Sequence, residues 1–318
     1  MDMQYLLWLQ ELREALPEFV EQFFLTVSAI AASEALVLVV AVIYWCLDKV
    51  LGEKLVLTFS VGSLITNTTK LIACVYRPWI LDGRIKPSVD ALPQATGYSF
   101  PSGHTQSAAC LFGATAWYER KKSKVLAAIL AAFVVLTAIS RNFLGAHTPQ
   151  DVLVGLAVGI ASIVLTERLI SWVDERDGRD RTVFVTTLAT LAVLTIFVLV
   201  KPYPMHYSES GALLVDPVEM QGDYFKTVGL VAGVVAGWYL ERRFVAFECS
   251  PKMGWKKIAI RLVVGIAVLV VCYLAAQPFK APGIDARIYH FAKTFLVLFA
   301  ASFLSPFAFT KVEQRLNI

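Results

Sequence analysis

The chain has 318 residues, of which 57% are hydrophobic and 17% charged, and its mean hydropathy is +0.62. Soluble domains are usually nearer half apolar and a quarter charged. The composition therefore argues against a soluble domain, a disordered chain, a collagen-like chain and a coiled coil. The net charge of +4 is too small to indicate a nucleic-acid partner. These numbers predict an integral membrane protein.

The first predicted element is an amphipathic helix over residues 1–24, where apolar and aromatic side chains are interspersed with charged ones, namely Glu11, Arg13, Glu14 and Glu18. Such a helix is expected to lie in the membrane interface. The segment lacks a basic start and a small-residue cleavage site, so we do not interpret it as a cleaved signal peptide. An ordinary first helix packed on the bundle is the alternative.

Nine apolar runs follow, each interpreted as one membrane-spanning helix, because about 20 apolar residues cross the hydrocarbon core. Strand-type alternation is absent, so the predicted fold is all-α, a polytopic membrane helix bundle. The runs lie near residues 25–46, 52–76, 103–118, 124–141, 149–172, 182–201, 224–240, 257–277 and 288–309.

Most of the 29 lysines and arginines fall in loops on one side of this predicted bundle. The positive-inside rule makes that side cytoplasmic. The N-terminus and the loops 77–102, 142–148 and 202–223 are then expected outside.

Three polar clusters interrupt the apolar chain at this predicted outer face. The first joins Lys70 to Arg77 and Pro78. Their spacing is almost two helical turns, which predicts that the two cations lie on one face about 10 Å apart along the axis, with Arg77 at the end of the helix before Pro78. A cation as deep as Lys70 is costly in lipid, which makes it a functional candidate. Snorkelling or a structural ion pair is the alternative.

The second cluster is the run 101–104. Ser102 is a plausible helix N-cap, and Gly103 allows a close approach to the backbone. A helix N-terminus with free amides can bind an anion. A simple cap would explain the same residues without any chemistry.

The third cluster, residues 140–151, joins two predicted spans. Thr148, Pro149 and Asp151 match a capping pattern, with Thr at the cap and an acid at the third helical position. Capping does not explain His147, nor Arg141 at an apolar helix end. The three clusters together supply cations and amides for a tetrahedral oxyanion, and a histidine with a carboxylate for nucleophilic or base chemistry.

The sequence therefore predicts a phosphate site. No His, Cys and carboxylate cluster has metal-ligand spacing, and no nucleotide-binding glycine loop is present, so neither a metal nor a cofactor is implied. The five cysteines are odd in number and widely spaced, which favours small membrane-buried residues over a disulfide or zinc framework.

These residues resemble the signature of the type 2 phosphatidic acid phosphatase (PAP2) superfamily. That signature is Lys, six residues and Arg-Pro; then Pro-Ser-Gly-His; then Ser-Arg, five residues, His, three residues and Asp. The chain carries the three parts in this order, over 70–78, 101–104 and 140–151. The resemblance covers roughly residues 25–201 and implies a six-span catalytic core.

By this resemblance, His147 would attack phosphorus to give a phosphohistidine, and Asp151 would orient its imidazole. His104 would protonate the leaving oxygen and then activate water. The phosphoryl oxygens would be bound by Lys70, Arg77, Ser102, Gly103 and Arg141.

The resemblance implies a metal-independent lipid phosphatase in the plasma (bacterial inner) membrane, with its site on the extracytoplasmic side. Expected substrates are polyprenyl (pyro)phosphates, phosphatidate, phosphatidylglycerol phosphate or sphingoid-base phosphates, in contact with membrane lipids. A phosphotransferase that passes the phosphate to a second lipid is a close alternative. Hydrolysis of a soluble phosphate ester, a non-catalytic transport or lipid-binding role, and a vanadate haloperoxidase are weaker ones.

The predicted organisation is an interfacial helix over 1–24, the core over 25–201, an extracytoplasmic loop over 202–223 and a three-span extension over 224–318. The extension could serve as an accessory bundle, an oligomer contact or a lipid-access route. Within the core, we expect the 79–100 loop to form a lid or to contact the headgroup.

Overall fold

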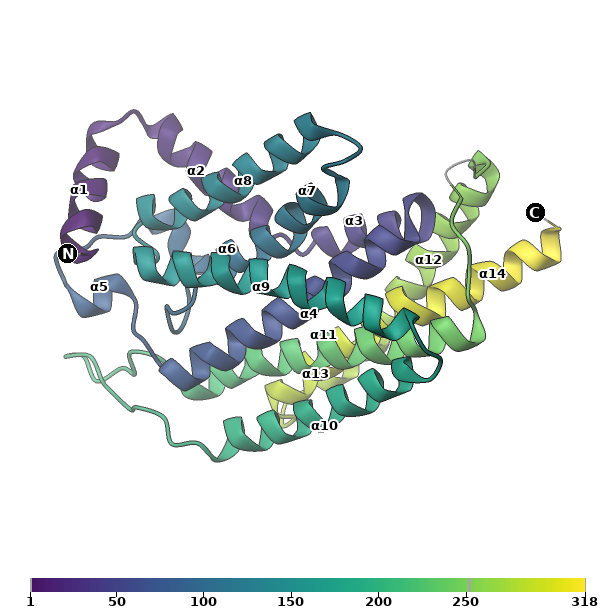
Figure 1. Ribbon diagram of the computed structural model, residues 1–318. Helices are drawn as coiled ribbons and strands as arrows, with labels where there is room; N and C mark the ends of the chain where they lie inside the picture. Colours follow the sequence, from purple (N-terminus) through teal and green to yellow (C-terminus); the bar gives the residue numbers. More distant parts are fainter. Residues whose placement is uncertain (1, 251–252, 318) are drawn as a thin grey trace. The chain divides into compact units, whose positions relative to one another are not determined.

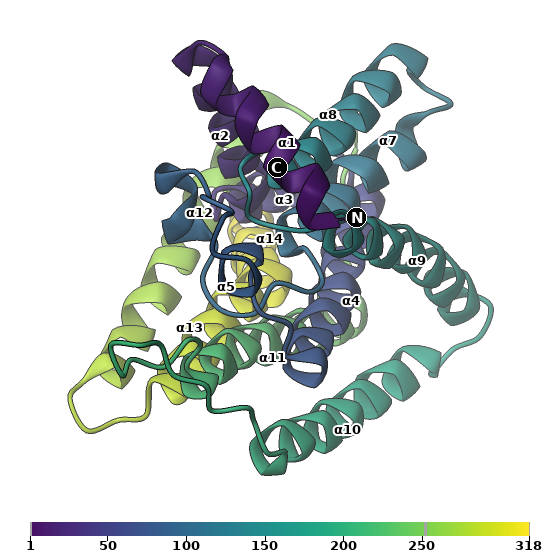
Figure 2. The ribbon, with the colours of Figure 1, turned by 90° about the vertical axis from the view of Figure 1, so that its left-hand side faces the viewer.

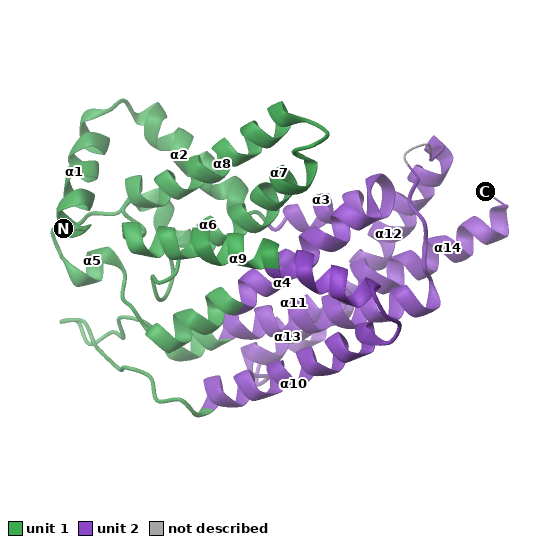
Figure 3. Cartoon of the chain, in the orientation of Figure 1, with its two compact units in different colours: residues 1–33, 65–164, 200–221 green, residues 34–64, 165–199, 222–318 purple. Residues whose placement is uncertain are grey.

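The computed structural model describes residues 2–250 and 253–317 and is all-α over this part of the chain, which confirms the predicted class (Figure 1). The chain forms two compact units. One comprises residues 1–33, 65–164 and 200–221, and the other comprises 34–64, 165–199 and 222–318 (Figure 3). Neither unit is continuous in sequence, because α4, α9 and α11 supply residues to both. The predicted domain boundaries follow sequence order and stay a prediction.

Within unit 1, α8 packs against α2, α6 and α7, and α7 is seen beside α8 in Figure 2. The elements are α1 (Asp2–Ala15), α2 (Glu18–Ala32), α5 (Pro78–Leu81), η2 (Val89–Gln94), α6 (Gly103–Ala108), η3 (Ala109–Gly113), α7 (Ala114–Glu119), α8 (Lys124–Phe143) and most of α9 (Pro149–Asp174).

Unit 2 is built mainly from long apolar helices. Its elements are α3 (Leu36–Val42), η1 (Ile43–Leu47), most of α4 (Lys49–Ala73), α10 (Arg179–Val200), most of α11 (Pro217–Phe244), α12 (Trp255–Ala276), η4 (Gln277–Lys280), α13 (Ala286–Phe299), η5 (Ala300–Leu304) and α14 (Ser305–Leu316).

Six helical stretches within the described residues are long and apolar enough to cross a membrane, so the protein is an integral, multi-pass one. A seventh results if α2 and α3–η1, broken at residues 33–35, count as one span. The six are Lys49–Leu81, Lys124–Phe143, Pro149–Asp174, Arg179–Val200, Trp255–Lys280 and Ala286–Leu316.

Three of the nine expected spans are not among these six. The 25–46 run is the broken pair of α2 and α3–η1. The 103–118 run is helical, but α6, η3 and α7 are short pieces of a 17-residue stretch that begins with polar side chains. The 224–240 run lies in α11, a helix of 28 residues whose hydropathy is lowered by glycines and by charged residues at both ends. Helix α11 is therefore long enough to cross a membrane, but it is not apolar enough to be counted among the six spans.

The glycines of α11 serve helix packing in unit 2. A Cβ atom added at Gly233 would lie 2.6 Å from the carbonyl oxygen of Phe295, and one at Gly237 would lie 2.6 Å from Cβ of Ser302. Gly229 makes an even closer approach to α13. Small residues at this four-residue spacing allow two membrane helices to pack backbone to backbone.

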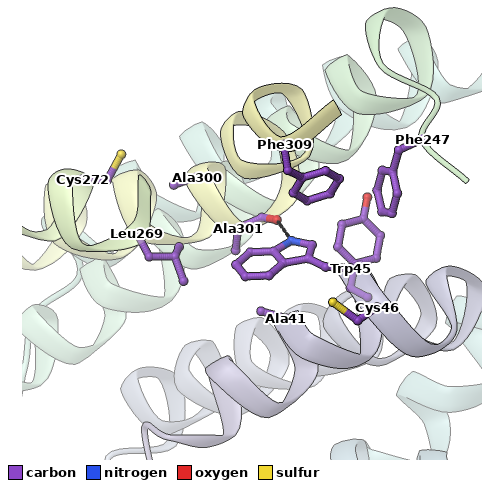
Figure 4. Packing of buried hydrophobic residues seen from close by; sticks show 10 residues of the cluster. Ala41, Trp45, Cys46, Phe247, Leu269, Cys272, Ala300, Ala301 and Phe309 are labelled. Atoms are coloured by element: carbon purple, nitrogen blue, oxygen red, sulfur yellow. Dashed lines mark hydrogen bonds between the residues drawn. The ribbon is translucent and has the colours of Figure 1, made fainter. Parts of the chain in front are cut away.

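The core of unit 2 surrounds Trp45, which is fully buried (Figure 4). Its indole Nε1 donates to the carbonyl oxygen of Ala301 at 2.9 Å. Arg261 lies fully buried beside this cluster and donates from Nε to Glu313 at 2.6 Å and from Nη1 to the Trp45 carbonyl at 2.6 Å. The buried charge of Arg261 is thus matched by partners, as burial in an apolar bundle requires.

Glu34, which falls within the expected 25–46 span, lies in the break between α2 and α3. Its carboxylate is 3.8 Å from Nζ of Lys293, and the side chain is 91% exposed. Glu34 therefore needs no partner inside the bundle.

Candidate functional site

All eight residues predicted for the site lie in unit 1. They come from five places in the chain, and hydrogen bonds connect most of them. Lys70 lies on α4, Arg77 precedes α5, Ser102, Gly103 and His104 start α6, Arg141 lies on α8, and His147 and Asp151 lie on either side of the start of α9.

His147 and Asp151 meet at the start of α9. Nδ1 of His147 is 3.3 Å from Oδ2 of Asp151, and both side chains are almost fully buried. Asp151 also accepts from the backbone N–H of Thr148 at 2.9 Å, and the hydroxyl of Thr148 accepts from the Asp151 N–H at 3.3 Å. The predicted capping pattern is therefore confirmed, and the same carboxylate reaches the histidine.

Arg77 does not share a helical face with Lys70, which corrects the expectation from their spacing. Helix α4 ends at Ala73, Cys74 has a positive φ of 49°, and Arg77 is extended. Pro78 disfavours helical geometry at the residue before it, and this accounts for the difference. The extended backbone instead directs Arg77 across the site.

The guanidinium of Arg77 is buried and joins the site to the 79–100 loop. Nη1 lies 2.9 Å from Nε2 of His147 and donates to the Ala146 carbonyl at 2.9 Å. Nη2 and Nε donate to the carbonyls of Thr96 and Gly97. Arginine has no acceptor atom, so Nε2 of His147 accepts this bond and its proton lies on Nδ1.

Arg141 is fully buried at the C-terminal end of α8. Nη1 donates to the hydroxyl of Ser28 at 2.5 Å. Its Nε and Nη2 groups are buried without a hydrogen-bond partner. A buried guanidinium with two unmatched donors is costly, so this feature requires an explanation beyond packing.

Lys70 is buried, and its ammonium group donates to the carbonyls of Tyr98 at 2.8 Å and Ser99 at 3.3 Å. These contacts hold the segment that precedes α6. Ser102 caps α6, as predicted, by accepting from the Thr105 N–H. The Ser102 N–H donates to the Asp151 carbonyl at 2.8 Å, which ties the start of α6 to α9.

Gly103 faces open space, since a Cβ atom added there would have no neighbour within 4 Å. By contrast, a Cβ at Gly155 of α9 would lie 2.6 Å from the Ser102 carbonyl oxygen. Helix α9 therefore packs tightly against the start of α6 on one side, while the glycine amide end remains open on the other. His104 lies beside this opening, with Nε2 3.3 Å from Oε1 of Gln94.

Burial lowers the pKa of His147 well below its ordinary value, and the positive charges of Arg77, Arg141 and Lys70 lower it further. Desolvation and nearby cations both disfavour the imidazolium. The imidazole of His147 is therefore neutral at pH 7.

Two residues that contact the site were missed by the sequence analysis. Ser99 is fully buried, and its hydroxyl lies 2.5 Å from Asp151 Oδ2 and 3.3 Å from His147 Nδ1. Arg13 of α1 donates to the Phe143 carbonyl at 3.2 Å and to the Lys86 carbonyl at 2.5 Å. No local pattern marks either residue, because their partners are distant in sequence.

The described residues contain no group of three or more His, Cys, Asp or Glu that could hold a metal ion. The five cysteines, all within the described part, are free. The fold and the site together define an integral membrane protein in which a buried histidine–carboxylate pair is surrounded by lysine and arginine.

Comparison with known proteins places this arrangement in a family. Residues 53–176 match the sequence model of the PAP2 superfamily. Residues 225–316 match that of the "PAP2 superfamily phosphatase, transmembrane extension". The chain belongs to the PAP2 superfamily.

Two curated proteins are similar to part of the chain. Phosphatidylglycerophosphatase B of Bacillus subtilis (strain 168) is 34% identical over 125 residues, which cover 37% of this chain and 59% of that protein. Undecaprenyl-diphosphatase of Sulfolobus acidocaldarius is 29% identical over 114 residues, which cover 34% of this chain and 50% of that protein. The chain thus spans between half and three-fifths of the length of these relatives. No solved structure matches it.

Proposed function

We propose that the protein is a lipid phosphatase that hydrolyses a phosphomonoester or pyrophosphate of an amphiphilic lipid through a phosphohistidine on His147. The observation that carries this proposal is the pair of buried, unmatched donors on Arg141. A phosphoryl group placed between Arg141 and the open amide end at Gly103 would satisfy both donors. The free-energy cost of burying these two Arg141 donors is then offset only when the substrate is bound.

The position of His147 supports a role as nucleophile. Its Nδ1 proton faces Asp151, so Nε2 carries the lone pair. In the proposed first step, Nε2 attacks phosphorus, the bond from phosphorus to the lipid oxygen breaks, and that oxygen takes the electron pair. Asp151 stabilises the positive charge that the imidazole then carries.

His104 is the proposed acid and base. It gives a proton to the leaving lipid oxygen and later takes one from the attacking water. Water then forms the new P–O bond, the P–N bond breaks and its electron pair returns to Nε2. Lys70, Arg77 and Arg141 supply the positive charge that phosphoryl transfer needs, so we expect the reaction to proceed without a metal ion.

The proposed substrate class follows from the surroundings of the site and from the names of the relatives. One relative is named for phosphatidylglycerophosphate and the other for undecaprenyl diphosphate. A membrane-embedded site accepts an amphiphile whose phosphate lies at the interface. We propose that the site faces the extracytoplasmic side of a bacterial inner membrane, on the loop charges alone.

The outer face of α1 fits the same membrane surface. Leu6 and Leu9 pack inward against Ile85 and Leu144 of the site loops. A neighbouring face of α1 exposes apolar and aromatic side chains that are suited to a lipid interface, namely Tyr5, Trp8 and Leu12, and Leu16 follows just after the helix. An Ala212→Cys variant labelled only from outside intact cells or spheroplasts would support the orientation, and labelling only from inside would refute it.

The experiment that tests the function is phosphate release by purified protein in the presence of EDTA, beside His147→Ala. The panel contains polyprenyl pyrophosphate and monophosphate, phosphatidate, phosphatidylglycerol phosphate, a sphingoid-base phosphate and glucose 6-phosphate. We expect release from at least one lipid, abolished in His147→Ala. Release that persists in the variant, release that EDTA removes, or no release from any lipid would contradict the proposal.

A further inference from the structure

We propose that Ser99 is a positioning residue of this site, whose hydroxyl bridges His147 and Asp151 and fixes both for attack on phosphorus. This inference rests on the proposed function, because positioning matters only if His147 is the nucleophile. Ser99 lies outside the three sequence clusters that predicted the site. It acts through His147 and does not touch the phosphoryl group.

The backbone of Ser99 is fixed on both sides. Its N–H donates to the Val75 carbonyl at 2.7 Å, just beyond the end of α4. Its own carbonyl accepts from the ammonium group of Lys70 at 3.3 Å. The side chain is therefore presented to His147 and Asp151 from a segment that cannot shift independently of α4, and it is fully buried there.

The direction of each hydrogen bond follows from the groups involved. A carboxylate has only acceptor atoms, so the Ser99 hydroxyl donates to Asp151 Oδ2, 2.5 Å away. The remaining lone pairs of the Ser99 oxygen are then free to accept from His147 Nδ1–H at 3.3 Å. Asp151 Oδ2 lies at the same 3.3 Å from Nδ1. The Nδ1 proton is therefore shared between two acceptors.

This bridge has two consequences for the nucleophile. Two acceptors on Nδ1 lock the ring against rotation and keep the proton there, so that the lone pair stays on Nε2. The hydroxyl also donates a hydrogen bond to the Asp151 carboxylate, which disperses part of its negative charge. The carboxylate therefore stabilises a protonated His147 less strongly in the free enzyme. Other ionisable groups that face His147 are Lys70 of α4, Arg77 before α5, His104 of α6 and Arg141 of α8.

The alternative to this proposal is that the Ser99 hydroxyl has only a structural role, like any other buried hydroxyl. Ser162 of α9 provides the matched control, because it is also fully buried in unit 1 and donates to the Val158 carbonyl of its own helix at 2.8 Å. Removing either hydroxyl takes away a buried hydrogen-bond donor. Only the Ser99 hydroxyl touches His147, so only its loss should alter the properties of that ring.

The first test measures His147 directly and needs no turnover. The chain has four histidines, so ring-labelled histidine gives four NMR resonances, and the spectrum of His147→Ala assigns the one of interest. In Ser99→Ala, Asp151 loses its hydroxyl donor and faces His147 with more of its charge. Loss of the Ser99 acceptor on Nδ1 acts in the opposite direction, but a neutral hydroxyl stabilises the imidazolium less than a carboxylate does. We therefore expect the titration midpoint of His147 to rise by about 0.5–1 pH unit. Ser162→Ala should leave it unchanged.

The second test is steady-state phosphate release. We expect Ser99→Ala to lower kcat roughly tenfold with KM within about twofold of wild type, because the oriented ring acts on the bound substrate. A midpoint and a kcat that both match wild type, or changes equal to those of Ser162→Ala, would overturn the inference. If Ser99→Ala does not fold, Ser99→Cys keeps the shape with a weaker donor, and the same two measurements apply. A wild-type protein that releases no phosphate would refute the proposed function instead, while the NMR test would still decide the role of Ser99.

Discussion

Two fully buried arginines allow a test of whether the site is built for an anion. Arg141 has two donors without partners, whereas every nitrogen of Arg261 has an acceptor at 3.3 Å or less. A structural arginine should resemble Arg261. An arginine kept for a ligand should reduce stability until that ligand binds.

The expected effects of substitution by methionine have opposite signs. Each unmatched buried donor costs ~1–3 kcal/mol, and the single bond from Arg141 to Ser28 contributes ~1.5–3 kcal/mol. Arg141→Met should therefore stabilise the unliganded protein by about 1–3 kcal/mol. Arg261→Met leaves Glu313 buried with Lys257 as its remaining ion-pair partner at 3.2 Å, and should cost about 3–5 kcal/mol.

The assay is thermal unfolding of the detergent-solubilised proteins with and without vanadate, followed by phosphate release. Vanadate should raise the Tm of wild type but not that of Arg141→Met. Loss of two charge-assisted bonds to the phosphoryl group should reduce kcat/KM by about 10²–10⁴-fold. The reasoning is refuted if Arg141→Met is destabilised as much as Arg261→Met, or if it retains wild-type activity.

Three further predictions address the nucleophile, its loop and the second unit. Because the pKa of His147 is lowered in the folded protein, the neutral form persists to below pH 6.5, and both activity and stability should fall only as the pH drops through lower values; an acid limb of kcat/KM centred above 6.5 would contradict this. Arg13→Met should lower kcat about tenfold, because the loop that carries His147 loses its anchor at the Phe143 carbonyl; an unchanged rate at saturating substrate would limit Arg13 to a structural role. Gly233→Val should destabilise the protein by about 1–3 kcal/mol, since the new Cβ meets a backbone carbonyl of α13; Gly254→Ala, where a Cβ has no neighbour within 4 Å, is its control in thermal unfolding.

The helices could be predicted because their signal is local. An apolar run must form a helix in a bilayer, whichever neighbours it acquires. The number of spans was harder to predict, because a helix can be long enough to cross a membrane without being apolar enough. The glycines of α11 lower its hydropathy and also allow its close contact with α13. The local sequence does not show that this contact will form.

The candidate site residues were predictable because their types and spacing are unusual in an apolar chain. Their geometry was not. The extended backbone at Arg77 follows from Pro78, yet the guanidinium direction depends on carbonyls near residue 96. Ser99 meets His147 across 48 residues, and Arg13 meets Phe143 across 130. Contacts of this kind are products of the tertiary fold.

The bond from Arg77 to Nε2 of His147 has a consequence for the resting protein. The Nε2 lone pair that would attack phosphorus already accepts a hydrogen bond from Arg77, so it is not available for attack in the unliganded protein. An incoming phosphoryl oxygen is a stronger acceptor than the imidazole and would draw that N–H away. The lone pair of His147 Nε2 would then become available only when the substrate binds. Neutral electrophiles without an anionic oxygen would not displace Arg77 and would not react with His147.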